Sequence, residues 1–249
     1  AFGYGEAKQA SHWQAIRVFV EEQGRPIAMV QALERRVLGF RITRINRGPM
    51  FFEDHPSEER IIAVYQALRR RWGRLPSGIL LIAPGLIDTP PNQALMKRAG
   101  FRQREGNGWG SARLDLRQHS DALFGSFERN WQKSVRASVK AGVSVEVTDR
   151  EEDHSWMIER HLANMAEKGF SGHDEHFLRA LRRNSGKDYV LLKAMHDGKP
   201  VAGLVLLKFG NVADSVVAWF GEEGRKVKAG NALTWGAIQE MQRQACQFY

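Results

Sequence analysis

Four cations between residues 129 and 140 have the spacing of a single helix face. Arg129, Lys133, Arg136 and Lys140 fall at positions i, i+4, i+7 and i+11. At about 100° per residue they span roughly 60° of a helix circumference, and no acidic residue lies among them. Such a cationic stripe suits a pyrophosphate or an RNA backbone, whose phosphates accept charge-assisted hydrogen bonds. A solvated basic face is the alternative that this pattern leaves open.

Four further side chains are candidates for substrate contacts. Arg47 lies in a turn after an extended run, where a guanidinium suits bidentate binding of phosphate or carboxylate, or a bridge between loops. His173 and His176 are three residues apart, and without a further ligand they make a poor zinc site, so we expect no metal. Trp219 ends an apolar run and either lines a cleft or belongs to the core.

Cys246 is the single cysteine and has no evident histidine partner, so covalent catalysis is not expected. The pattern identifies no general base, and the catalytic residues stay unknown at this point.

The composition limits the class of protein. The 249 residues are 43% hydrophobic, which is enough for a buried core and argues against disorder. The formal net charge of +9 indicates a polyanionic partner: nucleic acid, a nucleotide or an anionic membrane surface. No run approaches the roughly 20 apolar residues of a membrane span, and no signal-peptide pattern is present. With one cysteine, these features predict a cytoplasmic protein, free or at the cytoplasmic face of the membrane.

The elements that must position these residues occur twice. Residues 17–36 and 190–208 each contain an apolar run, a polar turn with glycine and proline, and a second apolar run, which predicts two β-hairpins. In each copy another extended run, a glycine and a long helical pattern follow in the same order and at nearly the same spacing. This shared order predicts two copies of one α/β unit.

The predicted boundary between the units lies near residues 105–113, which gives a first unit of residues 1–110 and a second of residues 111–249. Ser120 is the predicted N-cap of a helix that links the two units. The second unit stops where its copy of the strand 78–83 should begin, so we expect it to be truncated at its C-terminus. The expected strands are 40–45, 78–83, 114–116, 143–147 and 215–220, and the expected helices are 57–72, 92–99, 120–140, 154–168, 174–183 and 232–245.

Residues 94–102, with Leu95, Gly100 and Phe101, resemble the closing helix and strand of Gcn5-related acetyltransferases. Two such units in tandem resemble the Fem family of peptidoglycan-bridge aminoacyltransferases. Four further segments carry this narrower resemblance in the family's order. They are the aromatic and glycine-rich opening that ends at Lys8, the turn Asn46-Arg47-Gly48-Pro49, the basic segment 130–143 and the segment 165–170.

The resemblance implies an α/β (α+β) fold of two tandem GNAT-like domains, each a mixed sheet flanked by helices. It implies a transferase that moves an aminoacyl group from aminoacyl-tRNA to an amine of a pyrophosphate-containing peptidoglycan precursor, with no cofactor. It also implies that Lys8 meets a precursor phosphate. Because the family's acceptor-binding residues lie near the loop before residue 174, His173 or His176 is expected to contact substrate.

Three departures from the family pattern bear on these expectations. Some members have an acidic residue after the central strand of the first unit, where this chain has Ala83 and Pro84, so no general base is carried over. Some members have a long helical hairpin for tRNA in the second unit, and no such insert is present here. The family's segment after the last helix is also missing from this chain.

Two alternatives stay open. The first is an acyl-CoA-dependent N-acetyltransferase that uses acetyl-CoA on an envelope or exopolysaccharide precursor. That fold holds the CoA pyrophosphate in an Arg/Gln-x-x-Gly-x-Gly/Ala loop at a helix N-terminus. With Gly230 as the loop glycine, Val227 stands in the Arg or Gln place, and residues 51–57 of the first unit are acidic, which favours aminoacyl transfer. The second alternative is a non-catalytic nucleic-acid-binding protein, which the charge permits but no zinc or RNA-stacking motif supports.

Overall fold

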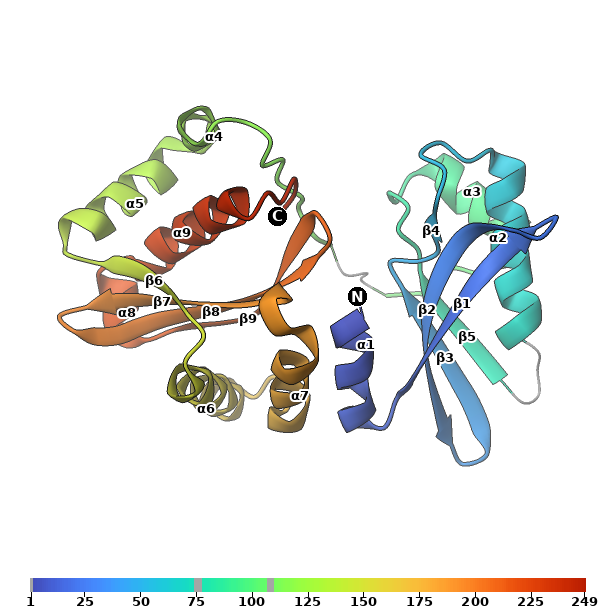
Figure 1. Ribbon diagram of the computed structural model, residues 1–249, viewed down its shortest axis with the longest axis horizontal. Coiled ribbons are helices and arrows are strands. Elements are labelled where there is room, and N and C mark those ends of the chain that lie inside the picture. Colours follow the sequence, from blue (N-terminus) through green and yellow to red (C-terminus); the bar gives the residue numbers. More distant parts are fainter. Residues whose placement is uncertain (1, 74–77, 107–109) are drawn as a thin grey trace. The chain divides into compact units, whose positions relative to one another are not determined.

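The computed structural model describes residues 2–73, 78–106 and 110–249, whose ribbon is shown in Figure 1. The chain divides into two compact units, Ala1–Trp109 and Gly110–Tyr249. Part of the stretch in which the sequence places the boundary, residues 107–109, lies outside the described residues. None of the described helices combines the length and the apolar character needed to cross a bilayer.

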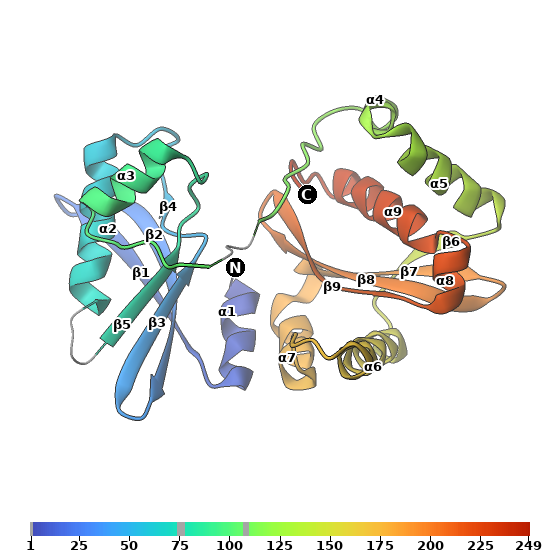
Figure 2. The same cartoon turned by 180° about the vertical axis from the view of Figure 1, so that it is seen from behind.

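Unit 1 is built on a five-stranded sheet, with β1, β2, β3 and β5 in that order and β4 paired to β2. The hairpin strands are antiparallel, whereas β5 runs parallel to β3, so the sheet is mixed as predicted. Helices α2 and α3 cover one face, and α1 lies against the other (Figures 1 and 2). The bounds are α1 (Phe2–Lys8), the 3-10 turn Gln9–Ser11, β1 (Gln14–Glu22), β2 (Arg25–Val37), β3 (Phe40–Asn46), β4 (Met50–Phe51), α2 (Glu58–Trp72), β5 (Gly78–Ala83) and α3 (Pro90–Arg98).

The local sequence explains where α2 forms. The Ser57 hydroxyl caps the helix by accepting a hydrogen bond from the Arg60 backbone N–H at 3.2 Å. Acidic residues stand in its first turn and three arginines in its last, which complements the helix dipole. Its apolar stripe, which includes Tyr65 and Leu68, packs on buried residues of β2 and β3. The predicted hairpin, strands and helices of unit 1 are thereby confirmed.

Unit 2 contains a four-stranded antiparallel sheet in the order β6-β7-β8-β9. Helices α5 and α9 lie over one face and α6 and α7 over the other (Figure 1). The hairpin β7–β8 and the strand β9 confirm the second predicted copy. The bounds are α4 (Ser120–Ser126), α5 (Arg129–Lys140), β6 (Ser144–Thr148), α6 (Glu151–Lys168), α7 (Glu175–Ser185), the 3-10 turn Gly186–Asp188, β7 (Tyr189–His196), β8 (Lys199–Phe209), β9 (Val212–Phe220), α8 (Glu222–Lys226) and α9 (Ala229–Arg243).

The linking helix differs from the prediction. It is two helices, α4 and α5, because the backbone is extended at Phe127 and Glu128. His119 caps α4 by accepting a hydrogen bond from the Asp121 N–H at 3.4 Å, so the prediction of Ser120 as N-cap is wrong. The expected strand at residues 114–116 is also wrong: it is a single antiparallel bridge to Phe248.

The end of α9 leads back to the sheet of unit 2. Phe248 forms a parallel bridge with Val212, the first residue of β9. In unit 1 the corresponding pairing joins Gly78, the first residue of β5, to Arg41 on β3. The residues after α9 therefore take the place that β5 has in unit 1, and the duplicated order of elements extends through this position.

A buried histidine of unit 2 is expected to make its stability depend on pH. His154 is almost fully buried beside Tyr189, and its Nδ1 has no hydrogen-bond partner in the described part of the chain. Burial, together with the nearby Arg182 charge, lowers the pKa of His154 to about 4, from an ordinary value of 6.5. The unfolded chain therefore binds a proton between these two pH values that the folded protein does not accept.

We expect the free energy of unfolding to fall as the pH drops from about 6.5 to about 4, by up to about 3 kcal/mol from this group. Denaturant titrations across this range should show the slope, and His154→Phe should flatten it. An equal slope in the variant and the parent protein would contradict this role of His154.

Candidate substrate-binding site

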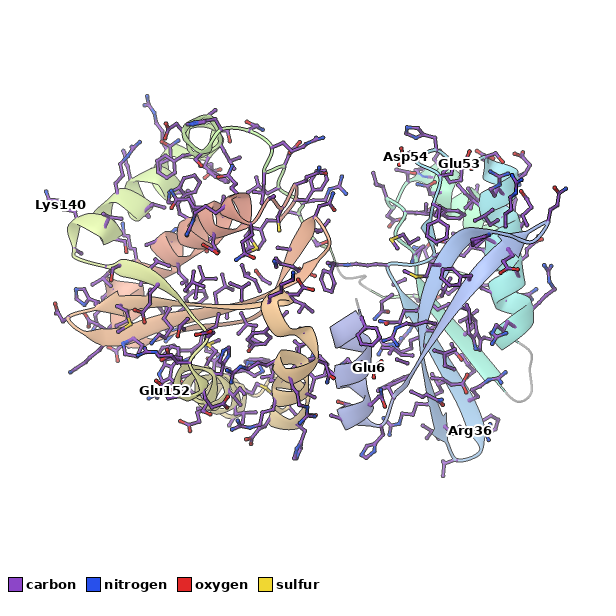
Figure 3. The ribbon with its side chains drawn as sticks, viewed as in Figure 1. Glu6, Arg36, Glu53, Asp54, Lys140 and Glu152 are labelled. Atoms are coloured by element: carbon purple, nitrogen blue, oxygen red, sulfur yellow. The ribbon has the colours of Figure 1, made fainter. Side chains whose placement is uncertain are left out.

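Helix α5 presents the cationic stripe to solvent. Val135 and Ser138 face inward and are buried where α5 packs on α9. Figure 3 shows Lys140 at the end of α5, directed away from the sheet. The four cations of the stripe are exposed, and within the described residues none of them has an ion pair. The predicted cationic face is present, and Val139 on the same helix is exposed as well.

Four aromatic rings lie beside the stripe and hold α5 against α4 and α9. The ring of Trp131 is 4.6 Å from Phe127, and that of Trp235 is 4.8 Å from Phe124, measured between centroids. The Arg136 guanidinium lies over the Phe124 ring at 5.2 Å, a cation–π contact that orients it. The rings therefore hold the backbone of α5 in place, and the contact with Phe124 restricts the side chain of Arg136.

Gln132 of α5 makes hydrogen bonds to the backbone at the break between α4 and α5. Its amide Nε2 donates to the backbone carbonyl oxygens of Phe127 at 2.7 Å and Gly125 at 3.2 Å. Its Oε1 accepts a hydrogen bond from Arg136 at 3.4 Å. The same glutamine thus satisfies the carbonyls left open by the break and helps to position one cation of the stripe.

In unit 1 the candidate residues are Lys8 and Arg47. Lys8 is the last residue of α1, and its Nζ lies 5.3 Å from the centroid of the Tyr4 ring. Arg47 follows β3 with a positive φ of 52°, and its backbone N–H donates to the Ala83 carbonyl at the end of β5, at 2.8 Å. Arg47 therefore stands where two parallel strands end together, the edge at which α/β sheets commonly bind ligands.

The histidine loop of unit 2 is organised by a residue that the sequence did not single out. His161, buried on α6, makes a hydrogen bond from Nε2 to the His173 carbonyl oxygen at 3.0 Å. Burial lowers the pKa of His161. The His173 ring stacks on Phe177 at 4.3 Å, whereas His176 is exposed on α7. Within the described residues no three His, Cys, Asp or Glu side chains gather as a metal site would require.

Trp219 lies away from the stripe within unit 2. Its ring packs edge-on against Trp156 of α6 at 5.5 Å, and the Arg160 guanidinium lies 5.5 Å from its centroid. These contacts place it on the face of the sheet that α6 covers, while α5 belongs to the opposite face (Figure 1). The sequence candidates of unit 2 are thus divided between the two faces of its sheet.

A buried ion cluster in unit 2 was not predicted. Lys193 on β7 contacts Asp153 Oδ1 at 2.5 Å and Glu146 Oε1 at 2.9 Å. Burial alone would raise the pKa of Asp153, but hydrogen bonds from Lys193, Thr148 and Arg150 outweigh it and lower that pKa to about 2. A carboxylate with so low a pKa is a weak proton acceptor at neutral pH, so the cluster is suited to a structural role.

The single cysteine does not supply a nucleophile. Cys246 is buried, its backbone N–H donates to the Met241 carbonyl at 2.9 Å, and its Sγ lies 4.0 Å from the Met241 sulfur. Burial raises the pKa of this thiol, which keeps it protonated and unreactive.

The helix N-terminus of unit 1 does not suit a CoA pyrophosphate. α2 starts with Glu58 and Glu59, and the preceding loop contains Glu53, so this end of the helix repels phosphate. Strands β3 and β5 stay paired from Arg41–Gly78 to Asn46–Ala83, and no gap opens between them.

The corresponding segment of unit 2 is also closed. An acetyl-CoA site would need an open glycine-rich loop before α9, but the chain forms the short helix α8 there. An ion pair of 3.0 Å joins Glu222 and Lys226, the first and last residues of α8. A Cβ on Gly224 of this helix would lie 2.3 Å from the Val201 carbonyl oxygen, which shows how closely α8 packs on β8. Neither unit therefore shows the open loop that the acetyl-CoA alternative requires.

Comparisons with known proteins give the family background. An acetyltransferase (GNAT) domain family matches residues 125–249, half of the chain. The curated lipid II:glycine glycyltransferase of Staphylococcus aureus is 26% identical over 161 residues, which cover 59% of this chain and 38% of that protein. The matched part is thus well under two thirds of that relative's length.

Solved structures show the same fold. The crystal structure of FemX matches with a TM-score of 0.81 at 17% identity, over 99% of this chain and 81% of that chain. A tandem GNAT protein from the clavulanic acid biosynthesis pathway matches at a TM-score of 0.51 and 15% identity, over 95% of this chain and 73% of that chain. These likenesses confirm the tandem GNAT-like fold, and together with the curated relative they confirm the resemblance to Fem-type proteins.

Proposed function

Since this chain belongs to the acetyltransferase (GNAT) domain family, we propose that it moves an aminoacyl group from aminoacyl-tRNA to an amine of a peptidoglycan precursor. The curated relative is named for glycyl transfer involving lipid II, which supports a precursor of this class as acceptor. The proposed place of action is the cytoplasm, at the membrane face where a lipid-linked precursor is presented.

The main support for this proposal is the cationic stripe of α5. Four exposed cations on one helix face have no ion pairs within the described residues, and the ring cluster holds the helix that bears them. Both proposed substrates are polyanions: tRNA has a phosphate backbone, and the precursor has a pyrophosphate. Phosphate contacts relieve the mutual repulsion of the four cations and release counterions.

The reaction needs positioning more than side-chain chemistry. The amine nitrogen of the acceptor attacks the ester carbonyl carbon of the aminoacyl group, and the bond from that carbon to the ribose oxygen breaks. The amine proton passes to the departing oxygen through a substrate group or water, and the product is an amide. In this proposal the stripe holds substrate phosphates in unit 2, and Lys8 and Arg47 do so in unit 1. His173 or His176 contacts the acceptor, and Trp219 is a further candidate contact on the face that α6 covers.

A transfer assay with two donors tests the proposal. We expect label from aminoacyl-tRNA to reach a lipid- or nucleotide-linked precursor, whereas acetyl-CoA gives no product and binds weakly or not at all in calorimetry. The closed segments at the starts of α2 and α9 give the reason.

Micromolar acetyl-CoA affinity together with acetyl transfer would replace this proposal by an N-acetyltransferase. Tight duplex binding without transfer from either donor would instead indicate a nucleic-acid-binding protein. A heat-inactivated sample, assayed with each donor, measures how much label reaches the precursor without the enzyme.

A further inference from the structure

The hairpin that joins β2 to β3 ends in an unusual loop. Four hairpins in the described part of the chain have two-residue loops. Three of them use the polar or small residues that such turns favour. Their loops are Gln23–Gly24, Asp197–Gly198 and Gly210–Asn211, whereas the fourth is Leu38–Gly39.

Leu38 is unfavourable for folding in two ways. Its φ is 48°, in the left-handed region where a leucine is strained and Asn, Asp or Gly is favoured. Its side chain is 94% exposed, so it contributes nothing to the core of unit 1. Neither the turn nor the packing of the unit requires a leucine at this position.

The neighbours of Leu38 extend the apolar surface. Val37 and Phe40 form the last residue pair of the hairpin and are 36% and 53% exposed. Figure 1 shows this end of the hairpin extending beyond α2, so it forms a convex projection of unit 1. We call Val37, Leu38 and Phe40 the apolar tip.

Arginines surround the apolar tip. Arg35 and Arg36 are exposed and have no ion pair within the described residues, and Figure 3 places Arg36 near the end of the hairpin. Arg41 pairs with Arg36 across the strands and is half-buried, with its Nε 3.8 Å from Glu34. The projection thus has an apolar end and a cationic collar directly behind it.

We propose that the apolar tip inserts into the interface of an anionic lipid bilayer while Arg35 and Arg36 contact lipid phosphates. An apolar end followed at once by cations matches the layers of a bilayer, in which acyl chains lie below charged headgroups. A protein partner fits less well, because a stable protein interface needs about 800 Å² from each side and this convex tip has only three apolar side chains.

The proposed function gives the reason for membrane contact, because a lipid-linked acceptor is found at a membrane. The evidence for the contact itself comes from the residues of the tip. The tip is also separate from Arg47, which lies beyond the opposite end of β3 from Phe40, about 23 Å away at roughly 3.3 Å per residue. Changes at the tip therefore leave Arg47 in place.

Vesicle co-sedimentation of the whole chain tests the inference. The vesicles are phosphatidylcholine alone and phosphatidylcholine with phosphatidylglycerol in about equal parts. We expect binding to the anionic vesicles, and Leu38→Asn should weaken it about tenfold, the range that burial of one large apolar side chain supplies. Arg35→Gln with Arg36→Gln should remove most of the preference for anionic over neutral vesicles.

Two controls separate membrane contact from folding. Leu38→Asn should leave the Tm unchanged or raise it, because asparagine tolerates the positive φ better than leucine. Ile87→Asn changes another exposed apolar residue of unit 1, which is 78% exposed, and should leave vesicle binding unchanged.

Wild-type vesicle affinity in Leu38→Asn would overturn the inference. A concentration-dependent dimer that Leu38→Asn abolishes would overturn it as well, in favour of a second copy of the chain at the tip. Transfer to a nucleotide-linked precursor in solution should be equal in the variant and the parent protein. If the parent shows no transfer but still binds vesicles through Leu38, the proposed function fails and the membrane contact stands.

Discussion

Replacing Arg136 and Lys140 together by glutamine is expected to raise the Kd for the polyanionic substrate about tenfold or more. Each substitution removes a charge-assisted hydrogen bond to phosphate, worth about 1.5–3 kcal/mol. The slope of log affinity against log salt should also fall, by roughly 0.7–0.9 for each phosphate that is no longer neutralised. Binding of tRNA and of a nucleotide-linked precursor, measured across a salt series, identifies which of the two the stripe holds.

The matched control removes the same charge elsewhere in unit 2. Lys168 and Lys199 are exposed and have no ion pair among the described residues, so Lys168→Gln with Lys199→Gln lowers the net charge equally. This control should bind nearly as the parent protein does. The stripe variant itself should stay folded, because i,i+4 repulsion of about 0.2–0.5 kcal/mol per pair is relieved. Unchanged affinity and salt slope in the stripe variant would reduce the stripe to a solvated surface.

Asparagine in place of Asp153 is expected to lower the free energy of unfolding by about 3 kcal/mol at neutral pH. The side chain of Lys193 is only 4% exposed, and the change removes the negative charge nearest to it. Since the folded pKa of Asp153 is about 2, below its ordinary value of 3.8, its stabilisation is present above about pH 4 and is lost as the pH falls towards 2. Chemical denaturation at neutral and acid pH measures both effects.

Two further variants isolate the cause. Glu146, the second partner of Lys193, is half-exposed, so Glu146→Gln should cost less than about 1 kcal/mol. Adding Lys193→Met to Asp153→Asn should recover much of the loss, because the unpaired buried cation is then gone. A stability of Asp153→Asn within about 0.5 kcal/mol of the parent would show that the cluster contributes little.

Periodicity predicted the repeated elements well because they follow local rules. The hairpins have glycine at the loop, and α2 has a serine cap and an apolar stripe, so each signal lies within a few residues. The break between α4 and α5 was missed because Phe124, Phe127 and Trp131 keep helical spacing across it. Their contact with Trp235 of α9, more than a hundred residues later, fixes the real geometry.

The surroundings of the candidate residues were harder to predict because they depend on pairing between distant parts of the chain. The spacing of the cations alone predicts the stripe on α5. The packing of the four aromatic rings beside it can be seen only in the folded structure. The contact between Glu146 and Lys193 arises from strand register, and the hydrogen bond of His161 to His173 joins a helix to a loop. Nothing in the sequence near these residues signals either contact.

The environment of Cys246 makes the native protein nearly unreactive towards thiol reagents. The only cysteine of the sequence is buried, and its thiol has a raised pKa, so thiol-reactive dyes should scarcely label the native chain. A cysteine introduced at an exposed position, such as Leu38→Cys or Lys140→Cys, would then be the dominant site of modification. Spectroscopic probes can thereby report separately from the hairpin end and from α5, with Cys246 left in place.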